Sequence, residues 1–222
     1  IVGSLVVTAG AMIIGTVFGL GLAIVLTIFC PKELAAILKP LIELLAGIPS
    51  VVYGFIVVVT IVPFIRDYFG GPGLSVLATS IVLGVMVLPT VTSISIDALK
   101  SVPRSYWEGS IALGATEWQS THMVMLKAAR SGIVAAIILG MGRAVGETMA
   151  VIMVCGNTLE IPKSPLDPLR TLTSNIALEM GYATGEHREA LFATAVTLFV
   201  IIMVLNIAAL TIARRGMVSS NR

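Results

Sequence analysis

Apolar residues fill five long stretches of the chain, and segments with Pro, Gly and charged residues separate them. A helix that crosses a bilayer core of about 30 Å needs roughly 20 mostly apolar residues, and each stretch reaches that length. The pattern therefore predicts an all-α integral membrane protein, a polytopic helix bundle that forms one transmembrane domain over residues 1–222. The five predicted spans are 1–29, 41–65, 74–99, 132–155 and 190–213.

The composition agrees with the membrane as the solvent of this chain. Charged residues make up 12% of it and the mean hydropathy is +1.02, whereas about a quarter of an ordinary soluble domain is charged. These values exclude a water-soluble fold. The net charge of +2, without one basic patch, also gives no reason to expect a nucleic-acid partner.

The basic residues predict how the spans are oriented, because Lys and Arg near span ends favour the cytoplasm. We predict that the side with more of them is cytoplasmic, so that the C-terminus is inside and the first residue of the chain is outside. Because the chain starts outside without a signal segment, we expect a further upstream span and six in the full protein. Nine basic residues lie on one side (Lys32, Lys39, Lys100, Arg104, Lys127, Arg130, Arg214, Arg215 and Arg222) and four on the other (Arg66, Lys163, Arg170 and Arg188).

Residues 100–131 form a long, mostly polar connection on the predicted cytoplasmic side. Apolar residues recur in it at helical spacing, at Trp107, Ile111, Trp118 and Met125. Such an amphipathic segment must lie against a partner or the lipid headgroups. Gly114 is suited to end one short helix and Thr116 to cap the start of a second. We therefore predict a short helix, a turn and a second helix.

Residues 156–189 form the long connection on the predicted outer side. Pro162, Pro165 and Pro168 lie within it, and this density of prolines predicts an irregular surface loop. The two histidines, His122 and His187, fall in the two different connections, so the sequence predicts no metal site.

Arg143 lies in the middle of span 132–155, and Glu147 follows one helical turn later on the same face. An ionised Arg at that depth costs between about 2.5 and more than 10 kcal/mol, so it needs a partner. Three interpretations stay open: Glu147 neutralises Arg143, the pair locks the helix to a partner subunit, or Arg143 offers its guanidinium to an oxyanion in an aqueous pathway. Thr148 could add a hydroxyl donor there.

Small residues and one proline give weaker signals. The pairs Gly15/Gly19 and Gly142/Gly146 have the spacing of close helix packing in membranes. Pro49 is a break that could kink span 41–65.

Part of the cytoplasmic connection resembles the EAA loop of ABC importer permeases, which usually reads Glu-Ala-Ala, three residues, then Gly. Here Gly and Ser stand in place of the two alanines. In that family the short helix docks on a cytoplasmic ATPase, so the resemblance implies an ATPase contact. The residues that would make it are Glu108, Gly109, Ser110, Gly114, Ala115 and Thr116.

Nearly the whole chain resembles the phosphate-specific permeases of the PstC type. The stretches that carry this resemblance are GMGRAVGETMAV, LLAGIPSVVYG, VLPTVTSISIDALKSVPRSYWEGS and LTSNIALEMGYATGEHREALF. It implies a type I ABC importer permease in the cell membrane that takes up inorganic phosphate, with Arg143, Glu147 and Thr148 in the substrate pathway. The implied partners are a second permease subunit (PstA-type), two ATPase subunits (PstB-type) and an extracytoplasmic phosphate-binding protein.

No G-x-x-x-x-G-K-[ST] loop occurs in the sequence, so we expect ATP and Mg²⁺ to be used by the partner ATPase and no cofactor on this chain. Neither G-x-S-x-G nor H-E-x-x-H occurs, and an intramembrane enzyme is disfavoured. Two alternatives remain: an importer permease for another solute such as sulfate or molybdate, and a secondary transporter, which also needs buried charges.

Overall fold

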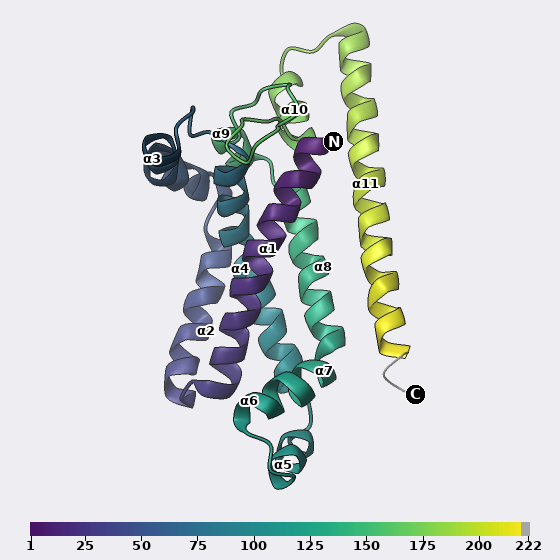
Figure 1. Ribbon diagram of the computed structural model, residues 1–222. Helices are drawn as coiled ribbons and strands as arrows, with labels where there is room; N and C mark the ends of the chain where they lie inside the picture. Colours follow the sequence, from purple (N-terminus) through teal and green to yellow (C-terminus); the bar gives the residue numbers. More distant parts are fainter. Residues whose placement is uncertain (219–222) are drawn as a thin grey trace.

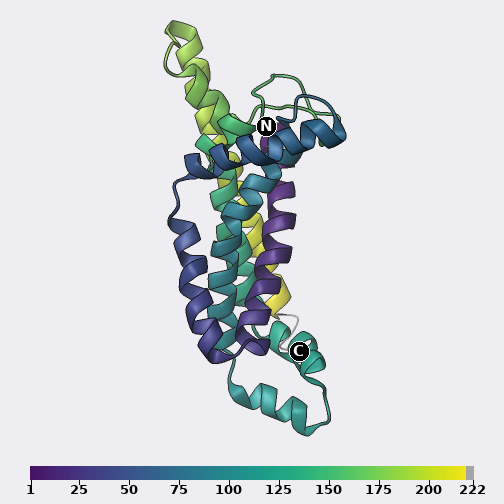
Figure 2. The ribbon, with the colours of Figure 1, turned by 90° about the vertical axis from the view of Figure 1, so that its left-hand side faces the viewer.

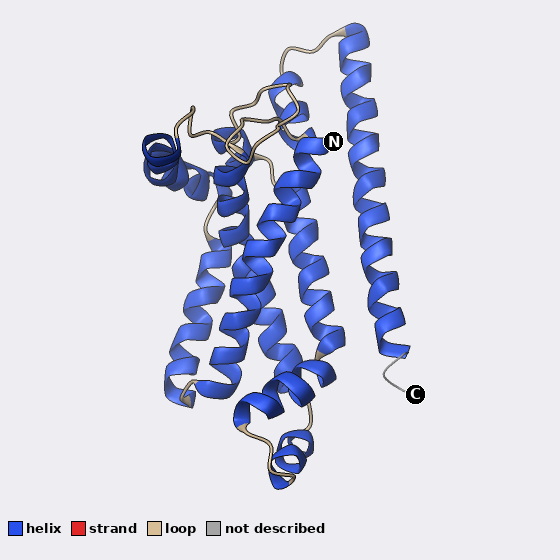
Figure 3. Cartoon of the chain, viewed as in Figure 1, coloured by secondary structure: helices blue, strands red, loops and turns tan. Residues whose placement is uncertain are grey.

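The computed structural model describes the backbone of residues 1–218 and the side chains of residues 1–211. Arg222, which the charge count placed on the cytoplasmic side, lies outside the described residues. Within them the secondary structure is helical, apart from one bridge pairing of Gly156 with Leu169. Figure 3 shows these helices and the loops that join them. The elements are α1 (Val2–Ile24), the π-helical η1 (Val25–Phe29), α2 (Lys32–Gly47), α3 (Ser50–Phe69), α4 (Val76–Lys100), α5 (Arg104–Ala112), α6 (Glu117–Gln119), the π-helical η2 (Ser120–Met125), α7 (Leu126–Ala128), α8 (Arg130–Gly146), α9 (Met149–Val154), α10 (Leu172–Glu179) and α11 (Gly185–Val218).

α4 is the central helix of the bundle, and α1, α2 and α8 run beside it (Figures 1 and 2). Its side chains are buried on nearly every face, and Val82, Val87 and Val91 have no exposed surface. A helix that is apolar all round and buried all round is the expected centre of a membrane bundle. We call the end of the bundle that carries residues 100–131 the loop end, which is the lower end in Figure 1, and the opposite end the N-terminal end.

Glycines on α1 let that helix approach α4 closely. A Cβ atom on Gly15 would lie 3.0 Å from Val87 Cγ1, and one on Gly19 would lie 3.0 Å from Val91 Cβ. The approach also brings the Thr92 hydroxyl within 3.1 Å of the Gly19 carbonyl oxygen, to which it donates. Close helix packing at the Gly15/Gly19 pair is therefore confirmed.

The same prediction for Gly142 and Gly146 is wrong for contacts within the described residues. A Cβ atom added at either position would have no atom of the described chain within 4 Å. These two glycines therefore leave an open strip on α8, although their spacing is the same as that of Gly15 and Gly19.

The predicted span 41–65 is wrong, because the chain turns sharply within it. α2 ends at Gly47, Ile48 is extended, and α3 begins at Ser50 after Pro49. Proline disfavours the helical conformation of the residue before it, which explains the extended Ile48. Figure 2 shows α2 running along the bundle and α3 lying across its N-terminal end.

The predicted span 132–155 is also broken. α8 ends at Gly146, Glu147 is extended, and the short α9 starts at Met149. At the loop end α8 meets the α6–α7 segment at a bend of 71°. The spans 1–29, 74–99 and 190–213 are confirmed as α1 with η1, α4 and α11. Among the described residues, four helices are long and apolar enough to cross a membrane, and counting the bent pair as one span gives five.

α11 stands apart from the other helices (Figure 1) and contacts mainly α8 and α10. Only 6% of its most apolar 18-residue window is buried inside the chain. Many side chains of this window are both apolar and exposed, so this part of the helix faces lipid or another membrane subunit.

The prolines predicted an irregular surface loop for the whole connection 156–189. This prediction is wrong for part of the connection. Its first part folds over the start of α4, where the Val76 amide donates to the Asp167 carbonyl oxygen at 2.9 Å and the Leu77 amide to that of Pro165 at 2.8 Å. These contacts satisfy amides of the first helical turn that have no partner within the helix. Leu169 is fully buried, and α10 and the first turns of α11 occupy the rest of the connection.

Candidate functional site

The guanidinium of Arg143 joins the ends of two helices at membrane depth. Arg143 lies in the last turn of α8. Its Nη2 donates to the Ala46 carbonyl oxygen at 3.3 Å and its Nη1 to the Thr90 hydroxyl at 3.5 Å. Ala46 lies in the last turn of α2, whose carbonyl groups lack helical partners and carry partial negative charge. The positive charge of Arg143 therefore stabilises the C-terminal end of α2.

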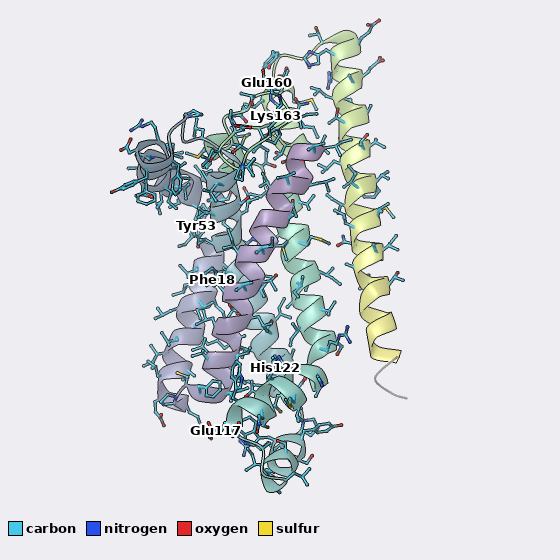
Figure 4. All side chains as sticks on the ribbon, in the orientation of Figure 1. Phe18, Tyr53, Glu117, His122, Glu160 and Lys163 are labelled. Atoms are coloured by element: carbon cyan, nitrogen blue, oxygen red, sulfur yellow. The ribbon has the colours of Figure 1, made fainter. Side chains whose placement is uncertain are left out.

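Tyr53 satisfies a second carbonyl group at the C-terminal end of α2. This residue (labelled in Figure 4) lies on α3, one turn beyond the break, and its hydroxyl donates to the Leu45 carbonyl oxygen at 2.7 Å. Its side chain is only 8% exposed, which agrees with a packing role. Two consecutive carbonyl groups of α2 are thus satisfied by side chains from two other helices.

Glu147 lies at the second break and does not pair with Arg143. Its Oε1 accepts from the Ala150 amide at 3.2 Å, and the Thr173 hydroxyl donates to its main-chain oxygen at 3.0 Å. No ion pair between Arg143 and Glu147 occurs among the described residues. The interpretation that Glu147 neutralises Arg143 on one helical face is therefore wrong, because the helix ends at Gly146 before the turn that would align the two.

The carboxylate instead serves the start of α9. A carboxylate at a helix N-terminus accepts from free amides and is favoured by the helix dipole. The Thr148 hydroxyl donates to the Gly146 carbonyl oxygen at 3.3 Å, so it bonds to a neighbouring backbone group. Every side chain at this break thus compensates for interrupted helical hydrogen bonds.

A small cavity adjoins Glu147. Its volume is about 10 Å³, and its lining combines apolar side chains with Glu147 and the hydroxyl-bearing residues Ser4, Thr8, Thr171 and Thr173. The sequence predicted neither these hydroxyl-bearing residues nor Thr90, because single hydroxyls in apolar helices carry no local signal of where they meet.

The two breaks lie at the same level of the bundle, because α3 packs directly on α9. A Cβ atom on Gly54 would come within 3.1 Å of Ala150 Cα and 2.9 Å of Met153 Sδ. Only glycine allows α3 to cross at this distance. The site therefore consists of two interrupted helices, with Arg143 between their ends.

The connection 100–131 has the predicted helix, turn and helix. α5 ends before Gly114, whose φ of +86° favours glycine, and Thr116 caps the following helix together with Gln119. Ser110 is hydrogen-bonded to Ser120 and so ties the two helices together. Figure 4 shows this segment at the loop end, where Glu117 and His122 are labelled.

Of the residues predicted to contact an ATPase, Glu108, Gly109, Gly114 and Thr116 are exposed, and Ser110 and Ala115 are half-buried. The amphipathic spacing is only half correct, because Trp107 and Met125 pack toward Leu99 while Ile111 and Trp118 are exposed. The predicted coupling residues and the predicted pathway residues lie at opposite ends of α8, and the structure does not bring them together.

An ion pair anchors α10 at the N-terminal end. Arg170 Nη1 lies 2.8 Å from Glu179 Oε1, and His187 Nε2 lies 3.5 Å from the other carboxylate oxygen. A hydrogen bond from Tyr182, together with the Arg170 guanidinium, lowers the pKa of Glu179, and the same carboxylate raises the pKa of Tyr182. Through His187 this cluster also attaches the first turn of α11.

Comparison with known families identifies the bundle. Residues 7–216 match the family described as the binding-protein-dependent transport system inner membrane component. The chain belongs to this family. It is therefore a multi-pass membrane protein of the ABC permease kind, as the resemblance in the sequence predicted, and its relatives are transport permeases.

Two curated relatives show how far the similarity extends. The chain is 50% identical over 185 residues to a probable ABC transporter permease protein, YqgH, of Bacillus subtilis, covering 83% of this chain and 60% of that protein. It is 35% identical over 222 residues to the phosphate transport system permease protein PstC of Mesorhizobium japonicum, covering 90% of this chain and 68% of that protein. The chain thus spans between three fifths and about two thirds of the length of these two relatives.

Solved structures with the same fold include the MetNI methionine ABC transporter in inward-facing conformations. One of its chains superposes with a TM-score of 0.74 at 23% identity, covering 96% of this chain and 93% of that one. An amino acid ABC transporter superposes with a TM-score of 0.65 at 19% identity. These similarities confirm the type I permease bundle that the sequence predicted.

Proposed function

We propose that this chain is the permease subunit of an ATP-driven importer of inorganic phosphate and forms the anion pathway with a second permease subunit. The proposal rests on the contacts of the Arg143 side chain. Its guanidinium contacts a carbonyl oxygen and a hydroxyl, and no carboxylate of the described residues pairs with it. A positive charge at membrane depth with only neutral partners is suited to attract an anion.

The geometry of Arg143 suits a tetrahedral oxyanion. A guanidinium has five N–H donors, and two are used by Ala46 and Thr90 within the described chain. The others can form a paired contact with two oxygens of one phosphate. Relatives of this chain named as phosphate transport system permease proteins, at 33 to 36% identity, support phosphate as the anion.

The proposed orientation follows from the basic residues. Lys32, Lys100, Arg104 and Lys127 lie toward the loop end, so we place this end in the cytoplasm and the first residue of the chain outside. The exposed segment from Glu108 to Thr116 then faces a cytoplasmic ATPase of the PstB type. The phosphate-binding protein would approach the opposite end, and a PstA-type permease would complete the pathway.

The energy for transport comes, in this proposal, from ATP and Mg²⁺ on the partner ATPase subunits. The 71° bend between the α6–α7 segment and α8 connects the ATPase-facing segment to the helix that carries Arg143. A displacement of α5 would reach Arg143 through this single 17-residue helix.

The experiment is ATP-dependent uptake of radioactive phosphate in vesicles that contain the complete importer. Arg143→Ala removes the charged hydrogen bonds, and we expect uptake to fall roughly 10- to 100-fold while basal ATP hydrolysis by the complex persists. Arg66→Ala is the matched control, because Arg66 lies at the end of α3 and pairs with Asp67.

Unchanged uptake by Arg143→Ala would remove Arg143 from the anion pathway and leave it as a helix-end contact. Sulfate and molybdate serve as competitors in the same assay. Phosphate uptake that either of them suppresses at equal concentration would contradict phosphate specificity. Uptake that survives ATP depletion would contradict the ATP-driven mechanism.

A further inference from the structure

A large cleft in the described chain lies at the loop end, away from Arg143. It opens between η1, α2, the last turn of α4 and the first turns of α5, and its volume is about 840 Å³. Cavities of this size accommodate small molecules and cofactors. Its inner wall is apolar and includes Leu26, Leu99, Trp107 and Met125.

The cleft lies at the depth where the apolar spans give way to charged residues. The first span ends at Phe29 and α4 ends at Lys100. The lining includes the last turn of each span and the first residues beyond, together with one side of α2 from Ala35 to Glu43. That level is the headgroup region of a bilayer. Trp107 in the wall is of the residue type enriched at this interface.

The rim of the cleft is positively charged. Lys32, Lys100 and Arg104 line it and make no ion pair with the described residues. Lys39 also lines it, but its ammonium group is 2.9 Å from Asp97 and 3.8 Å from Glu43, and these two carboxylates together outweigh its charge. Glu108 is the one other lining carboxylate, so four cations stand against three carboxylates, and the cations without an ion pair are Lys32, Lys100 and Arg104.

A hydroxyl group inside the cleft also lacks a partner. Thr27 Oγ1 is buried and has no hydrogen-bond partner among the described residues, and Thr27 lines the cleft. It lies in η1, where the α-helical hydrogen-bond ladder is interrupted. A buried hydroxyl without a partner costs free energy unless another group satisfies it.

We propose that this cleft is a binding site for an anionic phospholipid. The headgroup phosphate pairs with Lys32, Lys100 and Arg104, and the Thr27 hydroxyl donates to an oxygen of the lipid. The acyl chains lie on the apolar wall. Basic pockets between membrane helices at the cytoplasmic surface bind anionic headgroups in this manner. Inorganic phosphate shares the charge but leaves the apolar wall uncovered, so the lipid is the better occupant.

The test is native mass spectrometry of the intact importer complex, released from nanodiscs made of equal parts phosphatidylcholine and phosphatidylglycerol. We expect phosphatidylglycerol to be retained in preference to phosphatidylcholine. Each basic residue near the surface contributes roughly fivefold to the affinity, so the combined change Lys32→Gln, Lys100→Gln and Arg104→Gln should weaken retention about a hundredfold. Thr27→Val should weaken it several-fold by removing one hydrogen bond.

Two matched variants control for charge and for folding. Arg66→Gln, Lys163→Gln and Arg188→Gln together remove the same charge at the other end of the bundle and should leave retention unchanged. The charge-conserving set Lys32→Arg, Lys100→Arg and Arg104→Lys should retain the lipid, which separates loss of charge from loss of folding. Neither measurement depends on which solute is transported.

Any of four results would overturn the proposal. The first is equal retention of phosphatidylcholine and phosphatidylglycerol by the parent complex, and the second is loss of retention in the control set as large as in the cleft set. The third is displacement of the bound phosphatidylglycerol by millimolar inorganic phosphate, which would assign the rim to free phosphate. Cross-linking of a Thr27→Cys variant to the ATPase subunit would equally show that a protein fills the cleft.

Discussion

Two interruptions of membrane helices lie side by side in this bundle, and they arise in different ways. At the first, Ile48 has φ −68° and ψ 131°, and at the second Glu147 has the same two angles. Pro49 follows Ile48, whereas Thr148 follows Glu147. The same extended residue is therefore produced once before a proline and once without one, although the following residue differs: Pro49 has ψ 137° and Thr148 has ψ −56°.

The two breaks differ in their cause: local sequence favours the first, and tertiary contacts hold the second. Proline disfavours the helical conformation at Ile48, so the first break is favoured by the local sequence. Pro40, Pro63 and Pro89 lie inside α2, α3 and α4 without ending them, so a proline favours a break here but does not force one. The second depends on the Ala150 amide and the Thr173 hydroxyl, which bond to Glu147 from α9 and α10. The second break therefore keeps its geometry only while α9 and α10 stay packed around it.

We expect the largest loss of stability from a substitution that pushes the two breaks apart. Gly54→Leu places a side chain where a Cβ atom alone would lie 3.1 Å from Ala150 Cα. We expect it to lower the free energy of unfolding in mixed micelles by about 1 to 3 kcal/mol. Gly21→Leu is the control, because Gly21 has no neighbouring atom of the described chain within 4 Å. Equal losses for both variants would show that α3 and α9 do not need their close contact.

A smaller effect should distinguish the two breaks from each other. Glu147→Ala removes the acceptor for the Ala150 amide, and we expect a loss of about 0.5 to 2 kcal/mol. Pro49→Ala relieves the constraint on Ile48 while the packing of α3 is kept, so its cost should be about 0.4 to 1 kcal/mol. Unfolding of both variants under the same conditions measures the difference.

Glu147→Gln controls for the charge in that comparison, because the amide oxygen can still accept from Ala150. It should preserve most of the stability that Glu147→Ala loses. A larger cost for Pro49→Ala than for Glu147→Ala would reverse the assignment of local and tertiary causes.

The smallest effect should be local and dependent on pH. The pKa of Glu179 is lowered from its ordinary value of 4.5 by Tyr182 and Arg170, so its contribution to stability is complete above pH 4.5 and is lost as the pH falls through the lowered value. Hydrogen exchange of residues 172–183, corrected for the intrinsic rates, should therefore increase only below about pH 4.5.

Glu179→Gln should show the faster exchange already at neutral pH and no further change on acidification. Since α10 carries Thr173, the second break should loosen with it, whereas the amides around Ile48 should not respond. A parallel response at both breaks would contradict their independence.

The sequence predicted those parts of the fold that short-range chemistry decides. Spans 1–29, 74–99 and 190–213 were correct because run length alone determines them. The turn at Gly114 and the cap at Thr116 were correct because each depends on one residue type in one conformation. Pro49 was recognised as a break, yet its span was still predicted as one helix, because run length cannot reveal a change of direction.

The sequence identified residues of the candidate site but not the contacts between them. Arg143 is conspicuous in any apolar span, but its contacts with Ala46 and Thr90 join segments far apart in sequence. The predicted pairing with Glu147 assumed an unbroken helix, and no residue between Gly146 and Thr148 forces a break by itself. The roles of Arg143, Glu147 and Thr148 in transport, and those of Glu108 to Thr116 in ATPase contact, stay predictions.

The length of α8 has a mechanical consequence. Its 17 residues make a rod of about 25 Å, which is shorter than the roughly 30 Å bilayer core and is bounded by a 71° bend at one end and an extended residue at the other. With a pivot at each end and glycine at two open positions, such a rod can tilt without bending. A small rotation of α8 about its loop end then moves the Arg143 guanidinium sideways by several ångströms, in the plane of the membrane.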